Sequence, residues 1–241
     1  MSHPRSVSLP AFAVALVLGA GIGLPACKSE IDGKPKAAVS DVKKKSKDQE
    51  AKDKKAGHDK SQDKADEAKK ADKPATAGPV KSFRLDGSKS KIGFVGAKVT
   101  GDHRGHFGEL TGKLEAAGGE PAKLEIEVKT ASVEADHEKL TGHLKSPDFF
   151  DVEKFPTAKF VAKTFAKEAK DGATHKVTGE LELHGVKKEV SFPATIEASD
   201  AGAKGKAAFT INRKDFGIEY PGKPDDLIKD DVLLELELVF G

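Results

Sequence analysis

The amino-acid sequence predicts an all-β fold for residues 81–241 of this 241-residue chain. Hydrophobic and charged residues alternate with a period of two in many short segments, and turn sequences rich in Gly, Asp and Ser separate these segments. A single interval has the spacing of a helix. Roughly eight or nine strands with one apolar and one charged face imply a closed barrel or a sandwich. The alternation alone does not choose between these two architectures.

The first 26 residues have the composition of an export signal. Arg5 charges the start, and an apolar stretch follows from Leu9 to Leu24, which is short for a membrane span of about 20 apolar residues. The stretch ends in Leu24-Pro25-Ala26-Cys27, which resembles the lipobox of bacterial lipoproteins. That resemblance implies removal of residues 1–26 and acylation at Cys27, and several acyl chains anchor a protein firmly. A plain secretory signal with an incidental cysteine is the alternative.

Residues 27–80 are predicted to form a disordered tether between the export signal and the β domain. Residues 28–80 contain 15 lysines and 11 acidic residues, and their larger apolar side chains are Ile31, Val39 and Val42, which are too few for a core. Binding of the lysines to anionic lipid or cell-wall polymer is an alternative that the near-balanced acidic residues disfavour. Lys28, directly after Cys27, favours the outer membrane of a bacterial cell envelope, with the domain facing the periplasm, if enterobacterial sorting rules apply.

The β domain is expected to begin near Val80, and several of its segments alternate clearly. Leu124, Ile126 and Val128 share one face of a strand whose other face is charged. Turn sequences such as Gly118-Gly119 separate the strands. The predicted strands cover residues 82–86, 90–98, 105–116, 123–129, 158–166, 179–183, 187–198, 204–213 and 234–240.

One helix is predicted at about 135–146, where Leu140 and Leu144 are four residues apart and Asp136 is a suitable N-cap. The segment 148–151 that follows could place two carboxylates beside aromatic rings as an acid/base pair. We favour a structural role, in which aromatic residues form a plug at one end of the barrel: Phe149, Phe150 and Phe155.

Charge and cysteine content exclude several classes of function. Residues 81–241 carry a net charge of −3, and nucleic-acid binding would need a clustered basic face. The single cysteine, Cys27, excludes an intrachain disulfide and a zinc site built from several cysteines. The sequence has no Ser-His-Asp order, phosphate loop or dinucleotide glycine pattern. We therefore expect neither catalytic residues nor a nucleic-acid partner, and the protein is predicted not to be an enzyme.

Three polar groups require a separate interpretation. The segment 102–106 (DHRGH) offers two histidines and Asp102 as candidate metal ligands, but we favour an exposed polar hairpin loop and predict no metal site. Arg213 and Asp215 flank the end of a strand, where an internal ion pair and a contact to a ligand head group both stay open. His184-Gly185 is predicted to serve a turn.

Four segments carry a resemblance to a known family: FRLD at 83–86 with SKIGF at 90–94, LKSPDFFDVEKFP at 144–156 with AKF at 158–160, GELELHGVKKEV at 179–190, and INRKDFGI at 211–218 with IKDDV at 228–232. In order and spacing they resemble the YceI-like family of polyisoprenoid-binding proteins. The resemblance spans about 81–241. The export signal and the tether lie outside it.

This resemblance implies a lipocalin-like, extended antiparallel β-barrel of about eight strands with one short helix. Its interior would hold a long isoprenoid or quinone-like lipid, and no other cofactor is expected. Alternation cannot distinguish a hollow barrel from a filled one, so the cavity is an expectation from the family. The residues expected to line it are Phe94, Leu124, Ile126, Val128, Phe160, Leu181, Leu183, Phe209, Ile211, Leu234, Leu236 and Leu238.

The sequence thus predicts a binding protein, held in the membrane by acylated Cys27, that sequesters or carries a long apolar lipid. Two alternatives stay open. The first is an envelope structural or interaction lipoprotein with a filled barrel, and the second is a metal-dependent enzyme that uses residues 102–106. A homodimer is compatible with the sequence, which does not determine the oligomeric state.

Overall fold

A computed structural model of the chain describes residues 29–42, 79–170 and 172–241. The predicted export signal, Cys27 and residues 43–78 lie outside the described residues. The helical elements of the described residues are α1 (Glu138–Lys145) and the short 3-10 helices η1 (Thr130–Ser132) and η2 (Arg213–Phe216). The strands are β1 (Ala38–Asp41), β2 (Val80–Arg84), β3 (Lys91–Lys98), β4 (Gly101–Phe107), β5 (Leu110–Ala117), β6 (Glu120–Lys129), β7 (Val133–Ala135), β8 (Thr157–Lys170), β9 (Ala173–Leu183), β10 (Val186–Ser199), β11 (Gly202–Asn212), β12 (Gly222–Lys223) and β13 (Asp226–Phe240).

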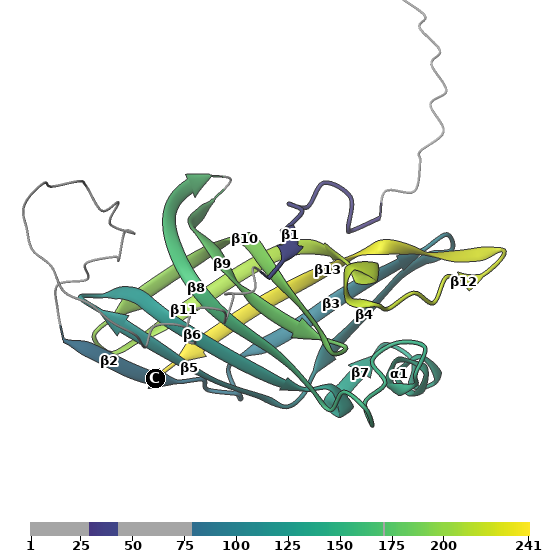
Figure 1. The fold of residues 1–241 in the computed structure, drawn as a ribbon, viewed down its shortest axis with the longest axis horizontal. Coiled ribbons are helices and arrows are strands. Elements are labelled where there is room, and N and C mark those ends of the chain that lie inside the picture. Colours follow the sequence, from purple (N-terminus) through teal and green to yellow (C-terminus); the bar gives the residue numbers. More distant parts are fainter. Residues whose placement is uncertain (1–28, 43–78, 171) are drawn as a thin grey trace, which may run out of the picture.

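The strands form one strongly curled antiparallel sheet, in the order β2-β5-β6-β8-β9-β10-β11-β13-β3-β4-β7 (Figure 1). Arg84 and Gly241 exchange backbone hydrogen bonds of 3.0 Å, and Leu85 pairs with Phe240, so β2 meets the end of β13 across the curl. Helix α1 and β12 lie at one end of the elongated molecule, and β2 and the C-terminus lie at the other (Figure 1). The prediction of an all-β, lipocalin-like fold with one short helix is confirmed, in the form of a half-barrel.

The period-two alternation determines which side chains face the enclosed side of the sheet. In β6, Leu124, Ile126 and Val128 are buried, whereas the charged residues between them are partly exposed. The β9–β10 hairpin shows how a turn fixes this register. His184 and Gly185 have φ of 51° and 74°, as a two-residue type I′ turn requires, and Leu183 therefore pairs with Val186. The predicted turn at this dipeptide is confirmed.

Residues 101–117 differ from the prediction, because a hairpin divides them into β4 and β5. The sequence predicts a single strand over 105–116 and a loop over 102–106, but residues 102–106 lie within β4. Gly105 makes this pairing with β3 feasible, since a Cβ atom there would lie 2.3 Å from the ring of Phe94. The turn between the two strands lies at residues 108–109.

Helix α1 is shorter than the predicted interval 135–146, and its N-cap is His137. The predicted N-cap, Asp136, instead accepts a hydrogen bond from the side chain of His103 on β4. Leu140 and Leu144 lie on the buried side of the helix, as their spacing predicts, and Leu144 is 7 % exposed. The helix is thus attached to the sheet through an apolar face and a polar N-terminal corner.

The prediction of a tether from residue 27 onward is wrong for residues 29–42, which we name the N-terminal strap. The strap fills a gap in the barrel wall, since β10 pairs with β11 only from Thr195 to Ser199 and leaves an edge free. Strand β1 fills this edge by pairing with Lys188–Ser191 of β10, and Thr210 of β11 exchanges backbone hydrogen bonds with Pro35 and Ala37. Backbone pairing thus orders a segment that is too polar to form a core of its own.

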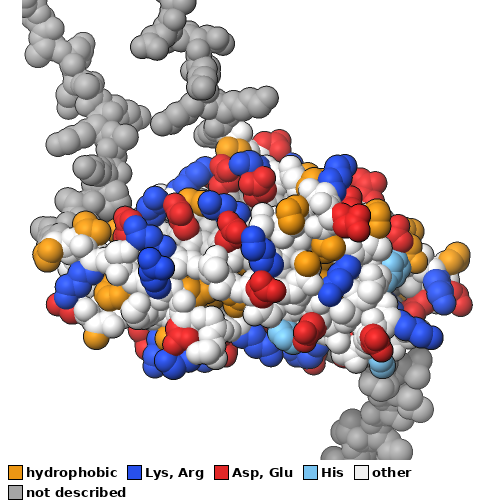
Figure 2. Space-filling model, turned by 90° about the horizontal axis from the view of Figure 1, so that it is seen from below, with side chains coloured by type: hydrophobic (Ala, Val, Ile, Leu, Met, Phe, Trp, Pro, Cys, Tyr) orange, Lys and Arg blue, Asp and Glu red, His pale blue; other side chains and the backbone are white. Residues whose placement is uncertain are grey.

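The outer surface of the barrel is polar and mixed in charge. On the face shown in Figure 2, lysine and arginine side chains are interspersed with aspartate and glutamate side chains. Many of these charges pair across neighbouring strands, as Lys187 does with Glu182 at 3.2 Å. In the part of the chain that the structure describes, no helix has the length and apolar character that a membrane span requires.

Candidate functional site

The enclosed face of the sheet surrounds two neighbouring cavities. The larger cavity contains about 1270 Å³ of space between its wall atoms, including its opening to solvent, and the smaller one contains about 540 Å³. Leu144 and Phe149 line the larger cavity, which therefore lies at the α1 end of the barrel. Leu114 and Phe240 line the smaller cavity, which lies toward β2 and the C-terminus. The interior of the barrel therefore contains unfilled apolar space toward both ends.

All twelve residues expected to line the interior are in the walls of these cavities. Leu124 and Leu238 line the smaller cavity, and the other ten line the larger one. Their inward orientation follows from the pairing of β3, β6, β8, β9, β11 and β13, whose registers place the apolar residues on one face. Contact of these residues with a ligand stays a prediction. Cys27, the predicted acylation site, lies outside the described residues.

Aromatic side chains separate the two cavities. The ring of Phe192 on β10 stacks on Phe209 with 4.0 Å between centroids, and Phe160 packs against Phe192 at 5.5 Å. Phe160 and Phe192 line both cavities. Phe192 is not among the residues expected from the sequence to line the interior, although it lies in the predicted strand 187–198 and alternates with the buried Val190 and Ala194.

Helix α1 and the segment after it cover one end of the larger cavity. Phe149 and Phe150 both line this cavity, as the interpretation of an aromatic plug expects. The ring of Phe150 packs against Phe107 at 5.4 Å, and that of Phe149 packs against Tyr220 at 5.3 Å. Phe155 lies elsewhere, with its ring 4.6 Å from the His184 ring at the β9–β10 turn, so it is not part of the plug.

A sequence profile of the YceI-like domain matches residues 83–240. The chain belongs to the YceI-like family. The matched region covers the β domain from β2 to β13, whereas the N-terminal strap precedes it. The family resemblance expected from the four sequence segments is therefore confirmed.

Sequence relatives and solved structures agree with this assignment. A UPF0312 protein of Pseudomonas putida (strain F1) is 38% identical over 139 residues, which are 54% of this chain and 71% of the relative. A UPF0312 protein of Pseudomonas fluorescens (strain SBW25) is 40% identical over 127 residues, 50% of this chain and 65% of the relative.

Two solved structures have the same fold as this YceI-like chain. BcnA of Burkholderia cenocepacia superposes with a TM-score of 0.57 and 23% identity, over 64% of this chain and 98% of that chain. A polyisoprenoid binding domain from Saccharophagus degradans, implicated in plant cell wall breakdown, superposes with a TM-score of 0.54 and 16% identity, over 66% of this chain and 97% of that chain.

Arg213 is the charged residue that lies deepest in the wall of the larger cavity, with 4 % of its surface exposed. Its guanidinium donates hydrogen bonds to the backbone oxygens of Ile218 at 2.8 Å and Lys229 at 3.2 Å. It also donates to Asp230 at 3.3 Å, so its acidic partner is Asp230 and not the neighbouring Asp215. Burial lowers the pKa of Arg213, while the charge of Asp230 opposes this effect. The contacts of Arg213 hold η2 and β13 together at the cavity wall.

The segment 102–106 does not converge on a metal as the enzyme alternative requires. Because it is a strand, successive side chains point to opposite faces of the sheet. Asp102 accepts hydrogen bonds from the N-terminal strap, and His106 lies 3.7 Å from Glu134 on β7. His103 points the other way, toward Asp136 at the start of α1, with 3.1 Å between His103 Nδ1 and the carboxylate.

Proposed function

We propose that this YceI-like chain is a membrane-anchored binding protein that holds the tail of a long apolar lipid in the larger cavity. The observation that carries the proposal is the wall of that cavity, which consists of aliphatic and aromatic side chains apart from Arg213 and Lys159. A polyisoprenoid or quinone-like lipid fits such a wall, and the structural neighbour from Saccharophagus degradans is a polyisoprenoid binding domain. Acylation of Cys27 would supply the anchor in the bacterial cell envelope.

The apolar lining of the larger cavity determines the kind of ligand that it can bind. Each buried methylene contributes about 0.8 kcal/mol, from which the cost of ordering the chain is subtracted. A long tail can therefore bind without a specific polar contact. The alternative of an envelope protein with a filled barrel would require a compact interior, which the two cavities do not favour.

The test is a substitution that fills the larger cavity without disturbing its wall. Gly96 on β3 lines this cavity, and a Cβ atom at this position meets no other atom within 4 Å. The Gly96→Leu variant is therefore expected to fold, to gain up to about 1 kcal/mol of stability from the filled space, and to lose most of its bound lipid. Organic extraction of the protein purified from a bacterial host, followed by mass spectrometry, measures the bound lipid.

The matched control is Gly142→Leu. Gly142 lies on the exposed side of α1, where a Cβ atom also meets nothing within 4 Å, and it is not part of either cavity wall. This variant is expected to keep the wild-type lipid content. Extracts of wild-type protein without lipid, or equal lipid content in both variants, would refute binding in the larger cavity.

A further inference from the structure

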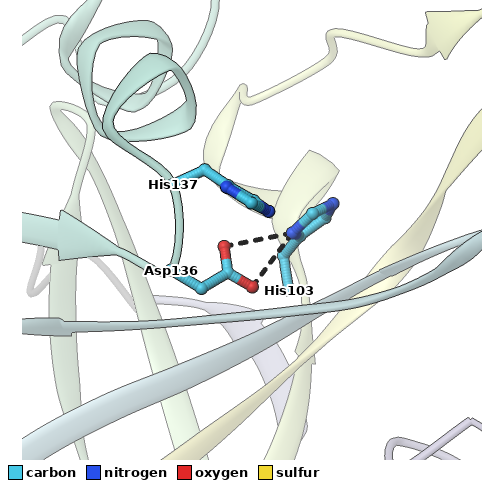
Figure 3. Close-up of side chains that lie close together, drawn as sticks. All are labelled: His103, Asp136 and His137. Carbon is cyan, nitrogen blue, oxygen red and sulfur yellow. Dashed lines mark hydrogen bonds and ion pairs between the residues drawn. The ribbon is translucent and has the colours of Figure 1, made fainter.

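His103, Asp136 and His137 form a cluster at the corner where α1 meets β4. His103 Nδ1 lies 3.1 Å from both carboxylate oxygens of Asp136, and the His103 and His137 rings are 5.9 Å apart. One potential ligand atom from each residue lies within 4.8 Å of the other two. Figure 3 shows that the three side chains point toward one another from two different elements.

This geometry is close to that of a tetrahedral zinc site. Zinc lies about 2.0–2.2 Å from histidine nitrogen and carboxylate oxygen, so neighbouring tetrahedral ligands are roughly 3.3–3.5 Å apart. The contact between His103 and Asp136 is already this short. The longest separation in the cluster needs to shrink by at most about 1.4 Å, which rotation of the His137 ring can supply, since its side chain makes no capping hydrogen bond to α1.

The surroundings support such a site. Two imidazoles and one carboxylate are ligands that zinc accepts, and the set leaves a fourth position for water. The backbone N–H of Arg104 lies 3.4 Å from Asp136 Oδ2, which helps to orient the carboxylate. His103 is partly sheltered, with 29% of its side chain exposed, whereas Asp136 and His137 open to solvent and give an ion access.

We propose that His103, Asp136 and His137 bind a divalent transition-metal ion of the zinc type. Because Asp136 and His137 lead directly into α1 and His103 belongs to β4, the bound ion would join the helix to the sheet. Helix α1 contributes Leu144 to the wall of the larger cavity. The ion would therefore hold this part of the cavity wall in place, although the site itself does not depend on the lipid proposal.

The test is zinc titration of the full chain against a chromogenic chelator, with cobalt(II) as a spectroscopic substitute. Wild-type protein is expected to bind one ion and to give the intense visible absorption of tetrahedral cobalt. The substitutions His103→Asn and His137→Asn are each expected to weaken binding at least about tenfold. His106→Asn is the matched control, because His106 lies on the same strand but faces Glu134, and it is expected to bind as wild type does.

A second set of measurements separates this site from other ligands and from unfolding. The titrations are repeated with Cys27→Ser, since an unacylated thiol also binds zinc, and circular dichroism verifies that each variant is folded. Zinc is expected to raise the thermal unfolding temperature of wild-type protein and of His106→Asn but not of His103→Asn. Equal zinc affinity in wild type and His103→Asn, or loss of binding with Cys27→Ser alone, would overturn the proposal.

Discussion

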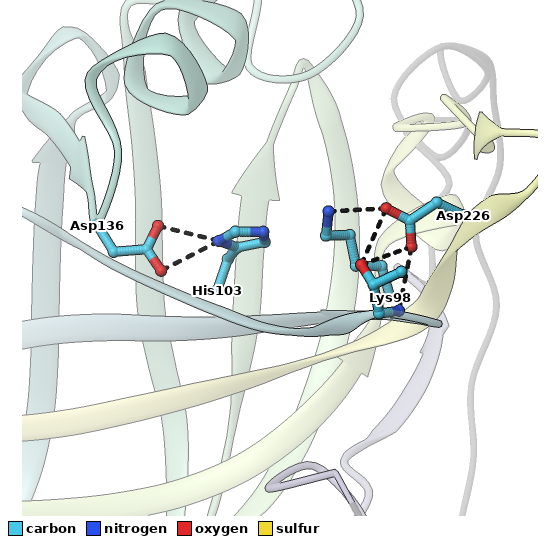
Figure 4. Close-up of polar contacts among 5 residues, drawn as sticks. Lys98, His103, Asp136 and Asp226 are labelled. Carbon is cyan, nitrogen blue, oxygen red and sulfur yellow. Dashed lines mark hydrogen bonds and ion pairs between the residues drawn. The ribbon is translucent and has the colours of Figure 1, made fainter. Parts of the chain in front are cut away.

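Asp226 shows how a single carboxylate can fasten the α1 end of the barrel. It accepts hydrogen bonds from Lys98 Nζ at 2.7 Å and from the backbone N–H of Thr100 at 3.1 Å, and it thereby connects the β3–β4 turn to the start of β13 (Figure 4). The side-chain hydrogen bond from Lys98 is the largest cause of the lowered pKa of Asp226. The folded chain therefore stabilises the ionised form of Asp226 more than the unfolded chain does.

The lowered pKa of Asp226 predicts an acid-dependent loss of stability. Its contribution is fully present above the ordinary pKa of 3.8 and disappears as the pH falls through the lowered value, since the unfolded chain then takes up the proton first. The Asp226→Asn variant is expected to be less stable than wild type at pH 7 and to lose less stability between about pH 5 and pH 2. Urea unfolding followed by circular dichroism measures both quantities.

The matched control for this prediction is Asp225→Asn, which leaves the hydrogen bonds of Asp226 in place. This variant is expected to keep the wild-type slope of stability against pH. Parallel pH profiles for wild type and Asp226→Asn would contradict a role for the ionised carboxylate.

At the residue scale, the sequence predicts which side chains face inward but not which polar side chains contact one another. The twelve inward residues could be predicted, because alternation assigns each of them to a face without knowledge of the partner strand. The partner of Arg213 could not be predicted from the sequence. Asp230 lies on β13, and only the pairing of β13 with β11 brings it to Arg213, whereas Asp215 is merely closer in sequence. The meeting of His103 with Asp136 depends in the same way on the pairing of β4 with β7.

At the scale of elements, the N-terminal strap is the feature that the sequence least indicates. Its composition is that of the rest of the predicted tether, and what orders it is an unpaired edge formed by strands more than a hundred residues away. Two buried apolar side chains accompany the backbone pairing. Ala37 is 6 % exposed and belongs to the main core, and Ile31 is 5 % exposed against Val95, Ala97 and Leu233 on the outer face of β3 and β13. The sequence feature that could have indicated a covering segment was therefore the presence of apolar residues on the outer face of β3 and β13, namely Val95, Ala97 and Leu233.

The strap is predicted to open as a local unit when the buried side chain of Ile31 is removed. Ile31→Ala deletes a buried side chain, a change that typically costs 2–5 kcal/mol, but detachment of the strap limits the loss to its own docking energy. Hydrogen exchange is therefore expected to accelerate in Ala38–Asp41 and in its partners on β10, while β6 and β9 keep their protection. Val39→Ala serves as a comparison within the same segment. Uniform acceleration through all strands would show that the strap is part of the cooperative core.

At the scale of the whole molecule, the strap determines where the proposed anchor meets the barrel. Ser29 Oγ donates a hydrogen bond of 2.8 Å to Asp102, next to the β3–β4 turn, and Cys27 precedes Ser29 by two residues. Val99 and Leu227 are 73% and 51% exposed, and a backbone hydrogen bond of 3.2 Å between them places them side by side at this end. An acylated Cys27 would thus bring these two apolar side chains and the α1 end of the larger cavity toward the bilayer.

This orientation predicts a difference between the two ends of the barrel on a membrane. An environment-sensitive fluorophore on Val99→Cys of the acylated protein, bound to vesicles of anionic and zwitterionic lipid, is expected to shift to the blue and to be quenched by a quencher on the acyl chains. The same label on Val80→Cys is expected to report water, since Val80 is 65% exposed but belongs to β2 at the opposite end (Figure 1).

Acylation leaves the introduced cysteine as the single free thiol, and the unacylated Cys27→Ser protein is expected to lose the signal at position 99. Equal quenching at both positions would mean that the barrel has no preferred orientation on the membrane, which would contradict this prediction.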